Sequence, residues 1–299
     1  MNSALQNRFL QTREISERIC APLQTEDYVI QSMDDVSPPK WHLGHTSWFF
    51  ETFLLGKFHK DYQPFHEKYN FVFNSYYESI GSRVLRPTRG LLSRPTVSEV
   101  YQYRKAITDR MTKLTNNLDD RDRSLFDFLT ELGIHHEQQH QELLYMDIKH
   151  ILSINPLRPT YIQREEDPIT GQVPAMKFQN FKGGIYDVGF RGEGFAFDNE
   201  TPAHQALLRD FKLGNRLVTN REYLEFMSDD GYSNPLLWLS DGWFNVKQNQ
   251  WESPMYWQKT ADHWEIMTLT GWHQLNLDEP VCHVSFYEAD AFAKWAGKR

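Results

Sequence analysis

The chain has 299 residues, of which 40% are hydrophobic and 24% charged, a length and composition that suit two globular domains with a core each. Its formal net charge of -8 at pH 7 is the wrong sign for gripping phosphate backbones, which excludes nucleic acid as an expected partner. Charges interrupt the first twenty residues and no apolar run reaches the length of a membrane span, so we expect neither a secretory signal nor a membrane segment. Cys20 and Cys282 are too few for a disulfide framework, and the cytoplasm is the expected location.

Helical periodicity begins near the N-terminus. Apolar residues at mostly helical spacing predict an amphipathic helix over residues 3–20, and Pro22 ends it. Ser37 is followed by two prolines, which predicts an N-cap with proline in the first turn. A second helix should therefore run over about residues 38–56, and its apolar stripe includes His45.

A long connection over about residues 57–95 follows, rich in aromatic residues, Gly, Pro and Arg. Connections of this length are usually either functional or disordered, and the aromatic residues favour order. Thr96 with Glu99 predicts a capping box that opens a third helix, and a fourth follows over about residues 123–152. Four amphipathic helices with one long crossover predict a four-helix bundle.

The composition changes beyond about residue 155. Helical periodicity becomes rare, and seven of the nine Trp residues fall in this half, so it should have a core of its own. We predict two domains, residues 1–160 and residues 161–299, the second loop-rich with short strands. Capping boxes predict two short helices in it: Thr219 with Glu222, and Ser285 with Glu288.

The fourth helix carries a pair of histidines with the spacing of metal ligands. His136 and His140 are four residues apart, so their imidazoles lie one turn above each other and can share an ion. A third ligand must come from another helix, and His45 points from the second helix into the same interior. Burying three imidazoles without partners is costly, whereas a divalent metal satisfies one nitrogen of each. Three neutral nitrogen ligands leave coordination positions open, which is typical of a catalytic site.

The alternative for any one of these residues is a hydrogen-bonded core histidine, and only the convergence of three favours a metal. Imidazole suits zinc, copper, iron and nickel alike, so the ligands leave the metal open. Glu142 lies about 200° around the helix from His140 and is not an expected ligand. Three further histidines lie off these stripes and are interpreted as surface residues or as supports of the ligands: His42, His135 and His150.

The long connection carries phenols and guanidiniums that could fold over the mouth of the bundle. Arginine suits a substrate carboxylate, because its guanidinium forms bidentate hydrogen bonds. The alternative is a solvated loop with two packed tyrosines. The residues concerned are Tyr76, Tyr77, Arg86, Arg89 and Arg94.

Long motifs spread over nearly the whole chain resemble a known family. The segments SPPKWHLGHTSWFFE, FNSYYESIGSRVLRPTRGLLSRPT and HEQQHQELL resemble the DinB-like domain of the ergothioneine-biosynthesis sulfoxide synthases (EgtB). The segments FAFDNETPAH, VTNREYLEFM, DGYSNPLLWLSDGW and PVCHVSFYEADAFAKWAGKR resemble the formylglycine-generating-enzyme (sulfatase-modifying-factor) domain that follows in that family. The resemblance implies an α+β multidomain fold, in which a DinB-like four-helix bundle precedes a partial, loop-rich α/β domain of the C-type-lectin-like kind.

The resemblance also implies a non-haem iron(II) enzyme that uses O2 to join the sulfur of cysteine or gamma-glutamylcysteine to the imidazole of trimethylhistidine (hercynine), giving a sulfoxide. Its partners would then be these small molecules. By position, Gln139 matches a residue that contacts the histidine-derived substrate. The other matches are the iron ligands His45, His136 and His140, the proton- or hydrogen-donating tyrosines Tyr76 and Tyr77, and the carboxylate-binding arginines Arg86 and Arg89.

One departure and three alternatives bear on activity. In the family the second domain continues past the WAGKR segment, so we expect a truncated member that keeps its metal with reduced or no turnover. The alternatives are an ovothiol-type synthase that uses plain histidine, a DinB-like hydrolase or thiol transferase with zinc or nickel, and a metal-binding protein without catalysis. A formylglycine-generating activity is disfavoured, because it needs a reactive cysteine pair and Cys282 has no nearby partner in the sequence. The sequence leaves the oligomeric state open.

Overall fold

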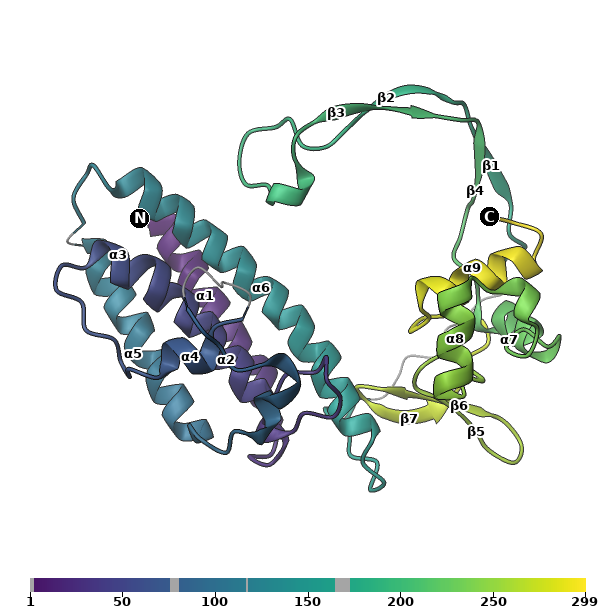
Figure 1. The fold of residues 1–299 in the computed structure, drawn as a ribbon, viewed down its shortest axis with the longest axis horizontal. Helices are drawn as coiled ribbons and strands as arrows, with labels where there is room; N and C mark the ends of the chain where they lie inside the picture. The colour runs from purple at the N-terminus through teal and green to yellow at the C-terminus, as the bar shows by residue number, and fades with distance from the viewer. Residues whose placement is uncertain (1–2, 76–80, 117, 165–172) are drawn as a thin grey trace. The chain divides into compact units, whose positions relative to one another are not determined.

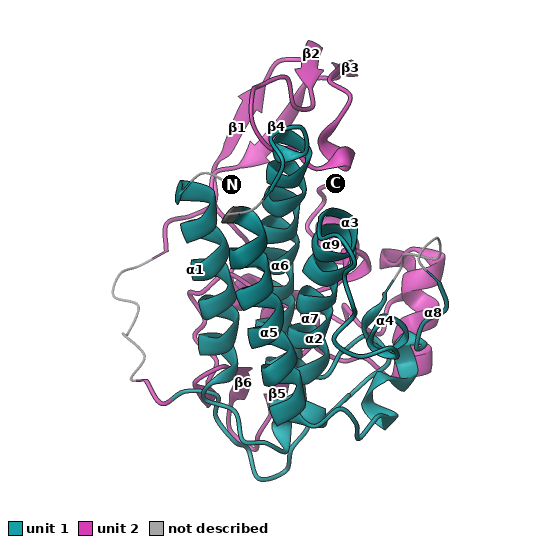
Figure 2. Ribbon diagram, turned by 90° about the vertical axis from the view of Figure 1, so that its left-hand side faces the viewer, with its two compact units in different colours: residues 1–162 teal, residues 163–299 magenta. Residues whose placement is uncertain are grey.

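The computed structural model describes residues 3–75, 81–116, 118–164 and 173–299. The chain divides into two compact units, Met1–Ile162 and Gln163–Arg299 (Figure 2). The first is helical and the second combines strands with short helices, so the chain has the predicted α+β character (Figure 1). Within the described ranges, no helix combines the length and apolarity that crossing a membrane requires.

Four long helices build the first unit (Figure 1). They are α1 (Ser3–Cys20), α2 (Pro39–Phe50), α5 (Val97–Asn116) and α6 (Arg123–Ser153). Helix α1 packs along α6, and α2 contacts both α5 and α6. Fully buried side chains from all four helices meet inside, among them Phe9, Trp48, Ile107 and Phe126. This confirms the predicted helical bundle, in which each apolar stripe faces the other helices.

Shorter elements shape the connections. They are η1 (Asp27–Val29), η2 (Glu51–Leu55), α3 (Gly56–Phe58), α4 (Tyr69–Phe73) and η4 (Arg86–Leu91). The second predicted helix continues beyond α2 through η2, which is a π-helical turn. This turn places the Glu51 carboxylate inside, where it accepts hydrogen bonds from the Tyr62 hydroxyl at 2.6 Å, the Phe65 backbone N–H at 2.8 Å and the Tyr103 hydroxyl at 2.5 Å. The start of the long connection is thereby tied to the bundle.

The beginning of α2 differs from the prediction at Ser37. The residue before the helix is Pro38, and no side chain caps it. The Ser37 hydroxyl accepts a hydrogen bond from Arg89 Nη1 at 2.9 Å instead, and its backbone N–H donates to the Asp147 carboxylate at 2.9 Å. The predicted N-cap was therefore wrong, because side chains distant in the sequence bind both the hydroxyl and the backbone N–H of Ser37.

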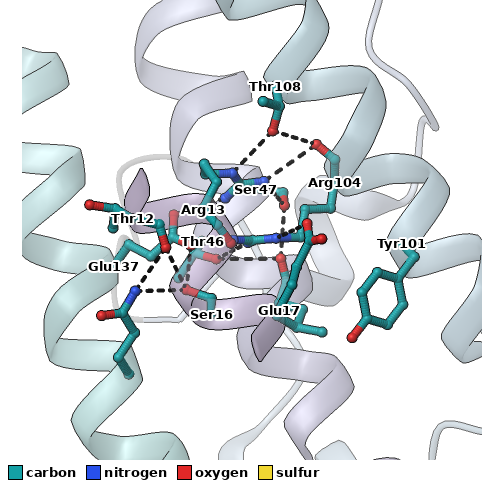
Figure 3. Close-up of polar contacts among 12 residues, drawn as sticks. Thr12, Arg13, Ser16, Glu17, Thr46, Ser47, Tyr101, Arg104, Thr108 and Glu137 are labelled. Atoms are coloured by element: carbon teal, nitrogen blue, oxygen red, sulfur yellow. Dashed lines mark hydrogen bonds and ion pairs between the residues drawn. The ribbon is translucent and has the colours of Figure 1, made fainter. Parts of the chain in front are cut away.

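A buried cluster of charges lies where α1, α5 and α6 meet (Figure 3). The Glu137 carboxylate accepts hydrogen bonds from Arg13 Nη1 at 2.9 Å, Arg104 Nη2 at 2.5 Å and Ser16 Oγ at 2.6 Å. Burial alone would raise the pKa of Glu137, but the two guanidiniums outweigh it and lower this pKa to about 2. Consecutive helical residues point about 100° apart, so α6 can direct Glu137 into this cluster and the adjacent His136 elsewhere.

Antiparallel strands distinguish the second unit. Strand β1 (Phe178–Phe181) pairs with β4 (Phe211–Gly214), and β2 (Gly184–Val188) pairs with β3 (His204–Leu208). A separate three-stranded sheet has the order β5-β6-β7, with Trp257–Lys259, Trp264–Thr268 and Gly271–Gln274. The first four strands are largely exposed, whereas β5 and β6 bury Trp257, Ile266 and Met267.

Short helices enclose the aromatic core of the second unit. They are α7 (Asn220–Ser228), α8 (Ser240–Asn249) and α9 (Phe286–Trp295), with the turns η5 (Asp198–Glu200) and η6 (Pro235–Leu237). Both predicted capping boxes are present, at the starts of α7 and α9. Helix α8 was not predicted, because its first turn contains Ser240, Asp241 and Gly242, which read as a turn. Gly242 is needed there, since a Cβ would come within 2.6 Å of Tyr287.

Candidate metal centre

Three imidazoles converge inside the first unit. His45 comes from α2, whereas His136 and His140 come from successive turns of α6. One nitrogen of each ring lies within 4.8 Å of those of the other two. The Nε2 atoms of His45 and His136 are 3.1 Å apart, and the ring of His140 lies 4.6 Å from that of His45 and 4.7 Å from that of His136, centre to centre. The structure therefore brings together the three residues that the sequence singled out.

Burial keeps these three rings neutral. It is the main cause that lowers the pKa of His136 to about 4 and the pKa of His45 and His140 well below the usual 6.5. The neighbouring imidazoles add to the effect at His45 and His140, because protonation of one opposes protonation of the next. Neutral imidazoles at pH 7 offer lone pairs, which is the form that binds a metal.

The outer nitrogens of two rings have fixed partners. His45 Nδ1 donates to the backbone carbonyl of Phe73 at 2.6 Å, so its Nε2 keeps a lone pair toward the cluster. His140 Nδ1 lies 2.8 Å from Nδ1 of His42. His136 Nδ1 is buried without a partner among the described residues. Three nitrogen donors that converge on one point, with the outer nitrogens of two of the rings hydrogen-bonded to protein, fit a divalent transition metal.

A cavity of about 730 Å³ opens beside the three histidines. Its lining includes the residues predicted to bind substrate, namely Arg86, Arg89 and Gln139. Glu142 also lines it, although its carboxylate is not part of the three-histidine cluster. The cavity thus combines a candidate metal site with cationic, amide and acidic side chains, which suits a small zwitterionic ligand.

Arg89 is held in place by several contacts. The side chain is buried, and its two terminal nitrogens donate to the hydroxyls of Ser37 at 2.9 Å and Ser75 at 3.1 Å. Its guanidinium carbon lies 3.5 Å from the centre of the Trp41 ring, and this ring stacks on His45 at 4.5 Å with an angle of 11°. The Trp41 ring therefore lies between the positive charge of Arg89 and the imidazole of His45, a candidate metal ligand.

The remaining predicted residues are placed differently. Tyr76 and Tyr77 lie outside the described residues. Arg86 lines the cavity but is half-exposed and donates to the Asp35 carbonyl at 2.5 Å, whereas Arg94 does not line it and donates to the Ser93 carbonyl. His135 and His150 are half-buried and absent from the cavity lining.

Two further residues belong to the site: the sequence left His42 as either a surface residue or a support of the ligands, and Asp147 was not considered. His42 is buried beside His140, and Asp147 is buried beside His42. A spacing signal for both exists: His42 precedes His45 by three residues and Asp147 follows His140 by seven, so each shares a helix face with a predicted ligand. Trp41, which contacts both Arg89 and His45, is a further residue of the site.

Comparisons with known proteins divide the chain between two families. Residues 8–144 match the DinB superfamily, and residues 168–299 match the sulfatase-modifying factor enzyme 1-like domain. These matches confirm the predicted pair of domains in the predicted order.

Curated relatives come from several bacteria. The chain is 32% identical over 176 residues to the hercynine oxygenase of Mycolicibacterium smegmatis, covering 58% of this chain and 39% of that protein. It is 34% identical over 116 residues to the hercynine oxygenase of Mycobacterium tuberculosis, covering 38% and 27%. The formylglycine-generating enzyme of Streptomyces coelicolor is 29% identical over 131 residues, covering 36% and 38%. The chain thus spans about two fifths or less of the length of the relatives it matches.

Proposed function

From a chain that joins a DinB superfamily domain to a sulfatase-modifying-factor domain and is related to hercynine oxygenases, we propose an oxygen-dependent non-haem iron(II) enzyme that acts on hercynine. Its reaction joins the sulfur of cysteine or gamma-glutamylcysteine to the imidazole of trimethylhistidine and yields a sulfoxide. In this proposal residues 1–160 form the metal-binding domain and residues 161–299 the sulfatase-modifying-factor domain. The observation that carries it is the convergence of three neutral imidazoles on one point at the edge of a cavity.

His45, His136 and His140 would hold the metal, each through the nitrogen that faces the cluster. When bound, iron(II) with only three protein ligands supplies open positions at which a thiolate and O2 meet the second substrate. The protein contributes proximity, because it holds the reactants in one cavity and restricts their relative motion.

Arg89 and Arg86 would bind the carboxylate of the thiol substrate. Both line the cavity, and buried Arg89 is already oriented by Ser37 and Ser75, so little rotamer entropy is lost when it binds an anion. Gln139, on the turn of α6 between the two histidines, would hydrogen-bond the histidine-derived substrate. The sequence resemblance assigns Tyr76 and Tyr77 as candidate proton donors to the reacting oxygen.

The test begins with metal. Purified full chain, freed of metal and titrated with iron(II) under nitrogen, should bind one equivalent, and His136→Ala should abolish this binding. His150→Ala is the matched control, since His150 lies on the same helix, half-buried and outside the cavity lining. Failure of the unaltered chain to bind a divalent metal would end the proposal. Tighter retention of zinc or nickel, with no reaction in iron(II), would favour the hydrolase or transferase alternative.

Turnover is then measured with trimethylhistidine and either thiol, O2 being admitted and a sulfoxide product sought by mass. Product with plain histidine in preference to trimethylhistidine would identify the ovothiol-type alternative. Metal binding with no product from either would identify a metal-binding protein without catalysis. Where turnover occurs, Arg89→Met should raise the KM for the thiol more than it lowers kcat, because its assigned role is binding.

A further inference from the structure

A chain of hydrogen bonds runs outward from His140 to a buried carboxylate. Nδ1 of His140 lies 2.8 Å from Nδ1 of His42, and Nε2 of His42 lies 2.8 Å from Oδ2 of Asp147. The same Oδ2 accepts the backbone N–H of Ser37 at 2.9 Å. We propose that His42 and Asp147 are positioning residues that fix the tautomer of His140, so that its lone pair faces the metal. This inference rests on the metal site proposed above.

The position of each proton in this hydrogen-bond network follows from the Asp147 carboxylate at its outer end. An ionised carboxylate can only accept, so His42 must carry its proton on Nε2 and present a lone pair at Nδ1. That lone pair accepts from His140, which must then carry its own proton on Nδ1. Nε2 of His140 is left as a bare acceptor, and this is the nitrogen available to the three-histidine cluster. A free imidazole would distribute between two tautomers, whereas the hydrogen-bond network selects the tautomer of His140 that binds metal.

The hydrogen-bond network lies in the wall of the cavity, where its members are largely buried. Only 2% of His42 and 8% of Asp147 is exposed, although both residues line the cavity. A group in this wall that lost its partner would therefore pay much of its desolvation penalty. The three residues come from two helices: His42 lies on α2, and both His140 and Asp147 lie on α6. The Ser37 N–H, just before α2, fixes the carboxylate from the α2 side. Closing α2 on α6 therefore assembles the metal site and its support together.

The other two ligands are not supported in this way. His45 donates to a neutral carbonyl, that of Phe73, and His136 has no partner at Nδ1 among the described residues. Of the three ligands, His140 alone is linked to an acid within the described part of the chain, through His42. Its imidazole should be the most electron-rich of the three, because an anionic acceptor at the end of the chain strengthens each bond along it. Loss of the support should therefore lower metal affinity without removing a ligand.

The first test measures metal affinity on the full chain by competition with a coloured chelator, using cobalt(II) and zinc(II). His42→Phe keeps an aromatic ring of similar size but removes the acceptor, and it should weaken binding by about 10- to 100-fold. His42→Gln offers a side-chain oxygen to His140 and should recover part of the loss. His135→Phe is the matched control on α6, since His135 is half-buried and absent from the cavity lining, and it should leave affinity unchanged. Equal affinities of His42→Phe and the unaltered chain would overturn the inference but leave the proposed metal site standing.

A second measurement needs no variant and no activity. With histidines labelled by 15N, long-range nitrogen–proton spectra of the metal-free and zinc-loaded chain report which ring nitrogen of each residue carries the proton. We expect the Nε2–H form for His42 and the Nδ1–H form for His140 in both states. A His140 found as the Nε2–H form before metal is added, or a His42 protonated on Nδ1, would overturn the inference. If the unaltered chain bound no zinc, the proposed function would fail instead, while the tautomers of the metal-free chain could still be read.

Discussion

Substitution of Glu137 by Gln should destabilise the helical bundle far more than any exposed ion pair between the same helices. Glu137 is fully buried, and it is the shared partner of two guanidiniums whose side chains are 3% exposed at Arg13 and fully buried at Arg104. Burial and the repulsion of Arg104 lower the pKa of Arg13 to about 10, whereas the Glu137 carboxylate acts to raise it. A further acid, Glu17, contacts Arg104 but is 45% exposed.

The size of the loss follows from the contacts. Glutamine keeps one oxygen and turns an amide N–H₂ toward one of the guanidiniums, so at least one of the two ionic hydrogen bonds becomes a contact between donors. Each such bond to a charged group is worth about 1.5–3 kcal/mol, and a buried charge left without its partner costs about 3–5 kcal/mol. We therefore expect Glu137→Gln to lower the free energy of unfolding of the first unit by about 3–5 kcal/mol.

Glu131→Gln is the matched control. Glu131 also lies on α6 and also pairs with an arginine of α1, Arg8, at 2.8 Å, but the two side chains are 33% and 47% exposed. Exposed pairs contribute about 0–1 kcal/mol. Hydrogen exchange followed peptide by peptide in the full chain separates α1, α5 and α6 from the second unit. A loss below about 1 kcal/mol for Glu137→Gln, no larger than that for Glu131→Gln, would refute the reasoning.

Two further outcomes are expected. The pKa of Glu137 and the pKa of Glu222 are both about 2 in the folded chain, against an ordinary 4.5, and the largest cause at Glu222 is its hydrogen bond with an arginine side chain. The two carboxylates therefore contribute their full stabilisation of the folded state above pH 4.5, and this contribution is lost as the pH falls toward 2. Urea midpoints that stay flat or rise across this range would contradict the assignment. Gly44→Ala should destabilise the first unit by about 1–3 kcal/mol and weaken metal binding, because its Cβ would overlap the ring of Phe73, whose carbonyl orients a candidate ligand. Gly56→Ala is the control, since its Cβ meets only a carbonyl oxygen at 3.4 Å, and equal losses in the two variants would exclude this cause.

Local sequence patterns were sufficient for most of the helices and for the three histidines. The apolar stripe of residues 3–20 became α1, and the capping boxes at Thr219 and Ser285 opened α7 and α9. The reason is that helix periodicity and capping depend on residues within one or two turns of each other. His136 and His140 were recognisable for the same reason, since a spacing of four residues alone places two imidazoles on one face.

The support of the site was decided only by tertiary structure. His42 and Asp147 are 105 residues apart in the chain, so no local pattern predicts their hydrogen bond. Nor does a local pattern predict that the Ser37 backbone N–H donates to the same carboxylate. No local pattern marks Glu137 and Arg104 as interior charges, because burial of a charge depends on which helices surround it. The partner of each buried polar group depends on how the helices pack. A group that packing removes from water must form its hydrogen bonds with the protein groups beside it.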